Sequence, residues 1–599
     1  MTRLATLVML SALLAANAAA QPRVPDRGLA AEGEGRWSEA LEIYRAELAR
    51  DPASAGLWLR VADIEARLGR PGHAIAALER AAKEAPAATT FERLSQAYAA
   101  AGHPLAAVRT IEAALALQPD HEPYLRSHAQ LATWAGDYAA AEWSYRTLRR
   151  QYPGDAELTL ALARVCVWGG STDAAVSSYR EYLAQPQAAP GVWLELARAE
   201  SWRGNFAVAL ETLERYRQIA GETREYMRER AGTLARGGRP GEALRYIEAL
   251  LPATPGDYEL NLSRTIALAR LRRQGDAYSS LTAVDALTPG RAETRATAGV
   301  LRSLLASNAG LPATFYSDSD GLRAFRATPK FDIGFSTDTR VHGGYEMVEL
   351  RARASSGLEQ LSGATTASVD HAWAGVTQRI GLLTVAGTIG QADTGADSMT
   401  TYSALARFAT DTVAASAERS SGFFTISPRT VGLGLTRVGH RLQLDWNPAL
   451  RYHLVLDASH EDLSDGNVRW EVFVSPRVEV ARRQRFNLDL GVLVHQFGAR
   501  HDFSNGYYDP DRYEYYSAVV SPYWKASERV GVAISAGIGG QRDDASRDFR
   551  LGTNASAEAT FGIYDAWVLK VNGSVTNNRR LESGAFSGSS GGIVLVKRF

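Results

Sequence analysis

The sequence has little cysteine, no long apolar run and no excess of charge of either sign. Cys166 is the single cysteine among 599 residues, which excludes an intramolecular disulfide and a paired-cysteine metal site. The 66 basic and 66 acidic side chains cancel, so no basic field for nucleic acid is present. No phosphate-binding loop, zinc-binding His-Glu-x-x-His or Gly-x-Ser-x-Gly elbow occurs. We therefore expect no cofactor, no metal site, no catalytic centre and no nucleic-acid partner.

A short apolar stretch lies at the N-terminus. Met1–Arg3 gives a basic start, Leu4–Leu14 is apolar, and small residues follow up to Ala20. This stretch is shorter than the about 20 residues of a transmembrane helix. The pattern favours a secretory signal peptide at residues 1–20, cut after Ala20, over a membrane anchor. Because no cysteine follows the cleavage region, we also expect no lipoprotein anchor.

A repeat of about 34 residues organises the first half of the chain. Successive glycines are separated by 34, 33, 34, 34, 34 and 34 residues: Gly35, Gly69, Gly102, Gly136, Gly170, Gly204 and Gly238. An alanine follows each of them after five residues: Ala40, Ala74, Ala107, Ala141, Ala175, Ala209 and Ala243. The spacing is typical of tetratricopeptide (TPR) helix–turn–helix repeats, and we predict such a domain over residues 21–308.

Each repeated residue type has a physical role. Glycine permits the sharp turn between two helices, and alanine fits where they cross most closely. Prolines 17 residues after five of the glycines end the second helix: Pro52, Pro86, Pro119, Pro153 and Pro255. A generic helical bundle is the alternative, but it does not explain six nearly equal gaps. Gly275 and Ser280 break the spacing, as expected of a terminal repeat.

After residue 308 the sequence changes to alternating strands. The linker Ser307–Pro312 is followed by period-two segments such as Phe331–Phe335 and Leu442–Trp446, separated by turn residues. We count roughly 14 to 16 strands over residues 309–599, a spacing typical of outer-membrane barrels. A soluble β-sandwich or propeller is the alternative. The signal peptide, the small or polar strand faces and the C-terminal Phe599, which resembles an insertion signal, favour the membrane barrel.

Aromatic and acidic residues of the barrel half are candidate contacts for a polymer. Tyr507, Tyr508 and Tyr513 have the chemistry to stack on sugar rings, although an interfacial aromatic girdle explains any single one more simply. Asp318 and Asp320 have the chemistry to accept hydrogen bonds from sugar hydroxyls at the barrel opening. Shaping a polar turn is an equally good explanation for these two residues.

The whole arrangement resembles the exopolysaccharide export porins of Gram-negative bacteria, namely the poly-N-acetylglucosamine porin and the outer-membrane subunit of cellulose secretion. Gly506–Tyr515 is similar to a Gly-Tyr-aromatic-x-Pro-x-x-Tyr segment of these barrels, and Ser317–Gly321 opens the barrel in a comparable way. The resemblance implies a passive conduit for a polysaccharide. This chain departs from it by having only about eight repeats and no acidic excess. That balance puts a cationic, partly deacetylated cargo in doubt.

These observations predict a non-enzymatic outer-membrane porin for biofilm-type exopolysaccharide. Its partners would be the polysaccharide chain, outer-membrane lipid, and periplasmic or inner-membrane synthesis and modification proteins that bind the repeats. Two alternatives stay open: a TPR scaffold of an envelope complex with a plugged barrel, and an outer-membrane hydrolase acting on lipid or glycan. We expect the repeats in the periplasm and residues 309–599 in the outer membrane. The predicted repeat-packing residues are Gly69, Ala74, Gly102, Ala107, Gly136, Ala141, Gly170, Ala175, Gly204 and Ala209.

Overall fold

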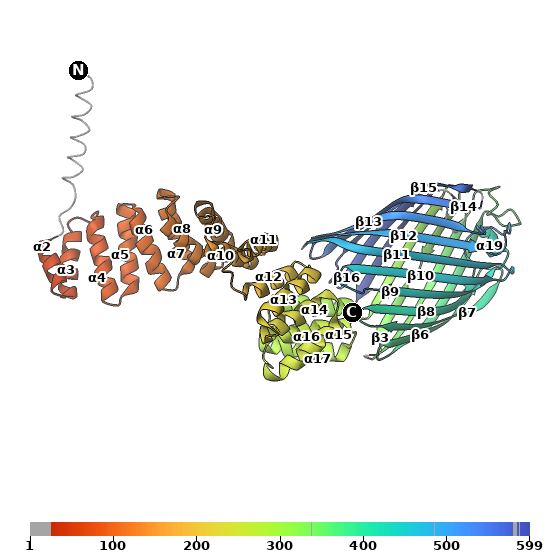
Figure 1. Cartoon of the computed structure of the whole chain (residues 1–599), viewed down its shortest axis with the longest axis horizontal. Helices are drawn as coiled ribbons and strands as arrows, with labels where there is room; N and C mark the ends of the chain where they lie inside the picture. Colours follow the sequence, from red (N-terminus) through yellow and green to blue (C-terminus); the bar gives the residue numbers. More distant parts are fainter. Residues whose placement is uncertain (1–24, 337, 484, 545, 579–583, 586) are drawn as a thin grey trace, which may run out of the picture. The chain divides into compact units, whose positions relative to one another are not determined.

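The chain folds into helical hairpins followed by an antiparallel barrel (Figure 1). The computed structural model describes residues 25–599 except 337, 484, 545, 579–583 and 586. The predicted signal peptide lies outside the described residues. Two compact units are present, one ending at Ala189 and one spanning Pro190–Phe599, so the second unit contains the later repeats and the barrel. The predicted fold class, a TPR solenoid followed by a β-barrel, is confirmed.

The helices pair along the chain in the order that the 34-residue spacing predicts. Their bounds are α2 Asp26–Gly33, α3 Trp37–Leu48, α4 Ala55–Arg67, α5 Pro71–Glu84, α6 Ala88–Ala100, α7 Pro104–Leu117, α8 Glu122–Ala135, α9 Tyr138–Gln151, α10 Ala156–Trp168, α11 Thr172–Leu183, α12 Val192–Trp202, α13 Phe206–Ala220, α14 Arg224–Gly237, α15 Pro240–Leu250, η1 Leu251–Ala253, α16 Tyr258–Arg270, α17 Gln274–Leu287 and α18 Ala292–Leu305. The first strand begins at Asn308.

The repeated glycines lie in the turns between paired helices with left-handed backbone. Gly69, Gly102, Gly136, Gly170 and Gly204 have φ between 70° and 85°, a conformation that glycine adopts without the Cβ clash of other residues. The repeated alanines lie where the helices cross. Their exposed fraction is 4% at Ala74 and 0% at the others: Ala107, Ala141, Ala175 and Ala209. A larger side chain at these crossings would have to push the helices apart.

The strands form one closed sheet. Their bounds are β1 Asn308–Asp318, β2 Arg323–Ala327, β3 Lys330–Gly334, β4 Thr339–Arg351, β5 Thr366–Ile380, β6 Leu383–Asp393, β7 Ser398–Ala409, β8 Val413–Phe423, β9 Thr436–Trp446, β10 Tyr452–Leu463, β11 Val468–Arg483, β12 Phe486–Ala499, β13 Tyr513–Ser527, β14 Val530–Asp543, β15 Ser546–Phe561, β16 Trp567–Thr576 and β17 Gly588–Arg598. Each strand pairs with its neighbours, and β1 pairs with β17 to close the barrel.

The barrel has sixteen strand positions because β2 and β3 share one. Both pair with β1 on one side and with β4 on the other. Thr328 and Pro329 separate them, and Pro329 has no backbone N–H to donate to the ladder. The result agrees with the predicted 14 to 16 strands. No helix among the described residues is long and apolar enough to cross a membrane.

The two ends of the barrel differ in their connections. At the end where β1 begins and β17 stops, here called the terminal end, the turns are short, such as residues 381–382 and 410–412. At the opposite, distal end the loops include residues 352–365, 424–435 and 500–512. Short turns at one end and longer loops at the other are typical of outer-membrane barrels.

Candidate functional site: the barrel lumen

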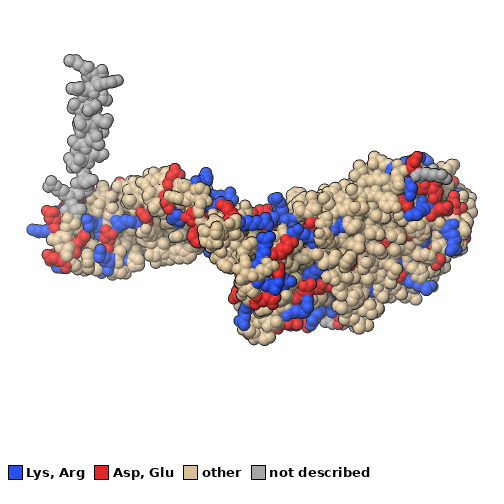
Figure 2. Space-filling model, viewed as in Figure 1, with Lys and Arg blue, Asp and Glu red and all other residues tan. Residues whose placement is uncertain are grey.

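Strand pairing sorts the barrel residues into two faces, because directly opposed residues of an antiparallel ladder point the same way. The register joins Leu442 on β9 to Ala417 on β8 and Ala458 on β10. This face carries exposed large apolar side chains around the sheet, including Ile389, Phe408, Trp446, Leu490, Ile538, Leu569 and Ile593. Figure 2 shows few charged residues over the middle of the barrel wall in the view drawn. The face of Leu442 is therefore the outside.

The opposite, inward face is polar, and several of its charged side chains form ion pairs. Arg441 Nε donates to Asp457 Oδ1 over 2.8 Å, and Arg437 Nη1 donates to Glu461 Oε1 over 2.9 Å. Further inward pairs are His495 with Glu471 at 2.8 Å, Lys570 with Glu558 at 3.3 Å, Thr388 with Ser403 at 2.8 Å and Ser574 with Ser590 at 2.7 Å. These pairs place hydrogen-bonding groups along the lumen wall and neutralise part of its charge.

Residues 424–435, here called the inner segment, fold into the distal part of the lumen. Arg326, an inward residue of β2, donates through Nη2 to the carbonyl oxygen of Thr425 over 2.7 Å. The guanidinium of Arg469, an inward residue of β11, lies 5.0 Å from the centre of the Phe424 ring. Because both strand residues reach the same short loop from inside the barrel, the inner segment occupies part of the lumen.

A short helix holds the inner segment in place. Ser427 caps α19 (Pro428–Gly432) in a capping box with Thr430. The Ser427 hydroxyl also donates to the carbonyl of Gly506 over 2.5 Å. Arg429 donates to the carbonyls of Ser504 at 2.9 Å and Glu359 at 3.0 Å. The inner segment is thus tied to two other distal loops.

Two cavities border the inner segment. One of about 500 Å³ is lined by inward residues of β2 and β4–β9, and one of about 250 Å³ extends towards β10 and β11. Arg326, Thr425 and Arg437 line both. The space inside the barrel is therefore narrowed where Arg326 meets Thr425.

The structure places Asp318 and Asp320 in the β1–β2 turn at the distal end. Asp318 Oδ1 accepts from the backbone N–H of Asp320 at 3.1 Å and of Leu322 at 2.9 Å. Its Oδ2 accepts from the Tyr316 hydroxyl at 2.9 Å. The carboxylate of Asp318 therefore shapes the turn, which is the alternative role considered from the sequence.

The three candidate tyrosines lie in or beside the long distal loop 500–512. Tyr507 is buried, donates to Asp465 Oδ2 over 2.8 Å and packs edge-on against Phe424 of the inner segment. Tyr508 donates to Asp543 Oδ2 over 2.8 Å. Tyr513 faces inward on β13 but is 0% exposed, stacked 4.6 Å from Phe497. In this structure Tyr507 and Tyr513 support the distal loops from within and present no open ring face.

Phe599 follows the last strand at the terminal end. Its backbone N–H donates to Ser307 over 3.0 Å, and its side chain is 62% exposed. Lys597 lies on the outward face, opposed by Trp567, and its Nζ is 5.4 Å from that ring. The lysine chain can therefore lie along the wall and keep its charge at the edge of the apolar band.

Sequence reasoning missed a groove of about 650 Å³ on the first unit, between α9, α10 and α11. Trp143, which is 51% exposed, and three arginines of α9 line it: Arg146, Arg149 and Arg150. Arg149 Nη2 lies 2.7 Å from each carboxylate oxygen of Glu181. Cys166 lies at its floor, where burial raises the pKa of the thiol to about 11, so the thiol stays protonated at neutral pH.

A periodic signal for exposed aromatics was available in the sequence. Trp134, Trp168 and Trp202 recur two residues before three successive repeat glycines, 34 residues apart. Each is about half exposed, at 56%, 53% and 48%. Large exposed aromatic rings at a fixed repeat position are unusual for residues whose only role is packing. The three tryptophans are therefore a recurring exposed position of the repeats.

Within the second unit, the later repeats are anchored to turns of the barrel's terminal end. Asp411, in the β7–β8 turn, accepts from the N-terminal backbone N–H groups of α15 at Gly241 (2.8 Å) and Glu242 (3.1 Å). Arg239 is buried and donates to the carbonyls of Asp411 and Asn447. A carboxylate at a helix N-terminus is favourable because it meets unsatisfied N–H groups and the positive end of the helix dipole.

Comparison with known proteins agrees with the fold. A tetratricopeptide repeat family model matches residues 26–89, 126–191 and 194–258. None of the curated proteins matches the chain. A solved structure described as a bacterial polysaccharide outer membrane secretin is 13% identical over 49% of this chain and 98% of its own, with a TM-score of 0.42. A tetratricopeptide repeat protein from Parabacteroides merdae is 16% identical over 41% and 98%, with a TM-score of 0.33.

The fold and the lumen define the class of protein. The chain has an N-terminal region of tetratricopeptide repeats followed by a closed sixteen-strand β-barrel of outer-membrane type. Its outside is apolar, its inside is polar, and its own residues 424–435 occupy part of the lumen.

Proposed function

We propose that this protein is an outer-membrane porin that exports an exopolysaccharide and catalyses no reaction. The observation that carries the proposal is the inward face, where paired charges and hydroxyls such as Arg441–Asp457 and Ser574–Ser590 line a wide barrel. A sugar chain has hydroxyls on every residue, so it can exchange weak hydrogen bonds with such a wall as it moves. A wall without strong net charge does not trap the polymer.

The exposed aromatics of the repeats fit the same function. Trp134 and Trp168 offer ring faces at a fixed spacing on the first unit, and Trp143 lies beside the arginines of its groove. Tryptophan faces stack on sugar rings and also anchor protein partners. In this proposal the repeats hold the emerging polymer, or a synthesis protein that carries it, in the periplasm.

The direct test is secretion of polysaccharide in the native host. Deleting the gene should abolish or strongly reduce cell-surface polysaccharide, and the wild-type gene should restore it. Double replacement of Trp134 and Trp168 by alanine should lower secretion without lowering barrel assembly, and Arg80→Ala on the exposed face of α5 is the control. Unchanged polysaccharide after deletion would exclude export.

The inner segment favours a second candidate function, a scaffold with a plugged barrel. A permanently filled lumen would pass no ions in a planar bilayer. The function of the protein would then be partner binding by the repeats. Stable, polysaccharide-sensitive conductance of the purified full-length protein supports the porin. A silent barrel, with secretion that depends only on partner binding by the repeats, supports the scaffold.

A further inference from the structure

Three outward side chains on neighbouring strands of the barrel wall are polar. The register opposes Arg419 on β8 to His440 on β9, and His440 to His460 on β10. They lie on the face of Leu442, and the two imidazole rings are 6.3 Å apart. The row is therefore a cluster of one guanidinium and two imidazoles on the outside of the barrel.

Among the residues that the structure describes, no carboxylate forms an ion pair with the three side chains of this row. Glu418 precedes Arg419 in the sequence and Arg441 follows His440, but both side chains point inward, where Arg441 pairs with Asp457. On β10, Glu461 points inward, and Asp462, two residues beyond His460, is the nearest acidic residue on the outward face. An unpaired cation on the lipid face raises the free energy of the folded barrel. Binding of an anion from outside the chain would lower that cost.

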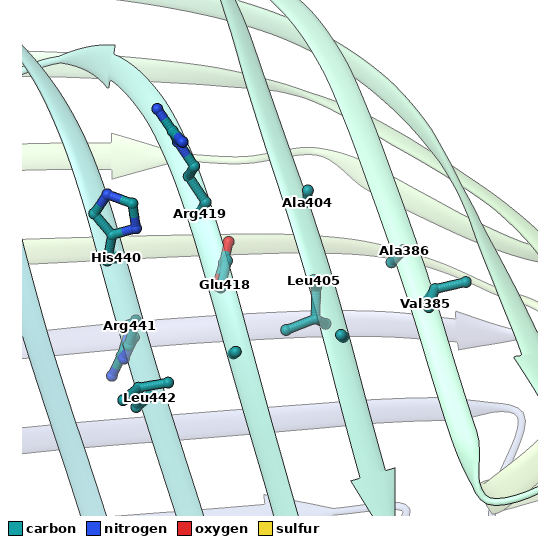
Figure 3. Close-up of a pocket in the computed structure, with 11 residues that line it drawn as sticks. Val385, Ala386, Ala404, Leu405, Glu418, Arg419, His440, Arg441 and Leu442 are labelled. Carbon is teal, nitrogen blue, oxygen red and sulfur yellow. The ribbon is translucent and has the colours of Figure 1, made fainter.

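A hollow of about 450 Å³ borders the row (Figure 3). Its lining contains two rows of outward residues from neighbouring strands. One runs Ala404, Arg419, His440, and the next runs Val385, Ala406, Ala417, Leu442. The remaining lining residues form the single intervening row, which alternation directs inward: Ala386, Leu405, Glu418 and Arg441. The hollow is therefore on the outside of the wall.

Side-chain size creates the hollow. Ala406 and Ala417 lie between the larger Val385 and Leu442, and Ala404 is opposed to Arg419, so the outer surface is recessed over β7 and β8. Figure 3 shows Arg419 and His440 on adjacent strands beside this recess. The recess is apolar away from the row and polar only at the row. This arrangement matches an amphiphile with an apolar chain and an anionic head.

We propose that Arg419, His440 and His460 bind the phosphate headgroup of a membrane lipid whose acyl chain lies in the hollow. A guanidinium binds phosphate with two parallel N–H donors, and each imidazole adds one N–H donor. The apolar recess commits the site to a lipid rather than to free phosphate. The site requires that the barrel lies in a membrane, but it does not depend on export of a polysaccharide.

Binding to the purified full-length protein in uncharged detergent tests the site, with native mass spectrometry as the measurement. The probes are diphosphorylated lipid A, the same lipid without phosphates, phosphatidylethanolamine and inorganic phosphate. We expect diphosphorylated lipid A to bind at least about tenfold more tightly than its dephosphorylated form, and inorganic phosphate to compete poorly. Equal binding of the two forms, or full competition by inorganic phosphate, would overturn the proposal.

Separate variants test the residues that bind the phosphate headgroup and the hollow that holds the acyl chain. Arg419→Ala and the double variant His440→Gln/His460→Gln should each weaken lipid binding about tenfold. Ala417→Phe should weaken it by filling the hollow while leaving the three cationic positions intact, and Ala406→Leu serves if Ala417→Phe does not assemble. Arg407→Ala, an inward arginine on β7, is the control. Wild-type affinity in Arg419→Ala, or in both hollow-filling variants, contradicts the site.

Discussion

Large apolar side chains lie inside the helical repeats but on the outside of the barrel. In the repeats, side chains such as Leu213 and Ile247 are wholly buried between helices, and charged residues face water. In the barrel, Ile389 and Ile538 are about 60% exposed on the outside, whereas Arg441 and Asp457 pair on the inside. The same hydrophobic driving force explains both in the proposed location, where water surrounds the repeats and lipid surrounds the barrel.

The two regions also differ in what holds them together. Each repeat depends on close side-chain packing at the helix crossings, where Ala107 and Ala141 have no exposed surface. The barrel depends on a closed ladder of backbone hydrogen bonds, which tolerates varied side chains provided that polarity matches the face. Substitutions should therefore act through volume in the repeats and through polarity in the barrel.

The largest effect should come from reversing polarity on the outer wall. Ile534→Lys places a charge on the lipid face and should cost about 2–4 kcal/mol near the middle of the membrane. Ser535→Lys, one residue further on β14, points inward beside Ser521 and should cost much less. The stability of both variants is measured by unfolding them in lipid vesicles, with the heat-dependent shift in gel mobility as the readout. Equal losses would contradict the assignment of faces.

Overpacking a helix crossing should have the next largest effect. Ala141→Leu adds volume where no space exists and should destabilise the repeats by about 1–3 kcal/mol. Ala139→Leu on the exposed side of α9 is the matched control. Thermal unfolding of the full-length protein, followed by circular dichroism at 222 nm, compares them. If both variants melt like the wild type, volume at the crossing does not limit the repeats.

Removing one contact between the barrel wall and the inner segment should change conductance through the lumen and leave the fold intact. Arg326→Ala deletes the donor to Thr425, so single-channel conductance in planar bilayers should rise. Lys570→Ala, which removes an inward cation of β16 away from the inner segment, should leave conductance near the wild-type value. A rise of the same size in both variants would mean that general lumen charge, rather than the inner segment, limits flow.

The smallest effect should be a pH dependence of the distal loops. Burial of Asp509 raises its pKa to about 6, above the usual value of 3.8, although the Phe503 N–H donates to it. The folded loop therefore favours the protonated acid, and its stability should fall as pH rises from about 4 to 6 and then level off. The loss between pH 5 and pH 7 should be about 1 kcal/mol. Hydrogen exchange of residues 500–511 at pH 5 and pH 7 measures this change. Asp509→Asn should remove it, and an unchanged profile in that variant would assign the effect to another group.

Local sequence patterns predicted much of the fold. The glycines and alanines recur because each repeat meets its neighbour in the same way, so the helix pairs could be predicted from spacing alone. Period-two alternation showed where strands lie, and the change in composition near Ser307 lies next to the start of β1 at Asn308. The number of strands followed from the residues available per strand and turn.

The contacts inside the lumen could not be predicted from the sequence in the same way. Arg326 and Thr425 are separated by 99 positions, and their contact depends on the register of every strand between them. Alternation predicts that Tyr513 and Tyr516 point to opposite faces, but it does not predict that Tyr513 is enclosed by Phe497. The inner segment has the composition of an ordinary loop, because folding inward requires only that its polar groups find partners such as the Gly506 carbonyl.

The sequence by itself determined the two-part architecture, since helical repeats and amphipathic strands arise from interactions between residues close in the chain. Only the tertiary structure decided which charges pair inside the barrel, which loop enters the lumen, and that Arg419, His440 and His460 form one outward row. Those features depend on closing a sixteen-position barrel with one register. A shift of one residue would exchange the inner and outer faces of a strand, so side-chain identity alone cannot locate them.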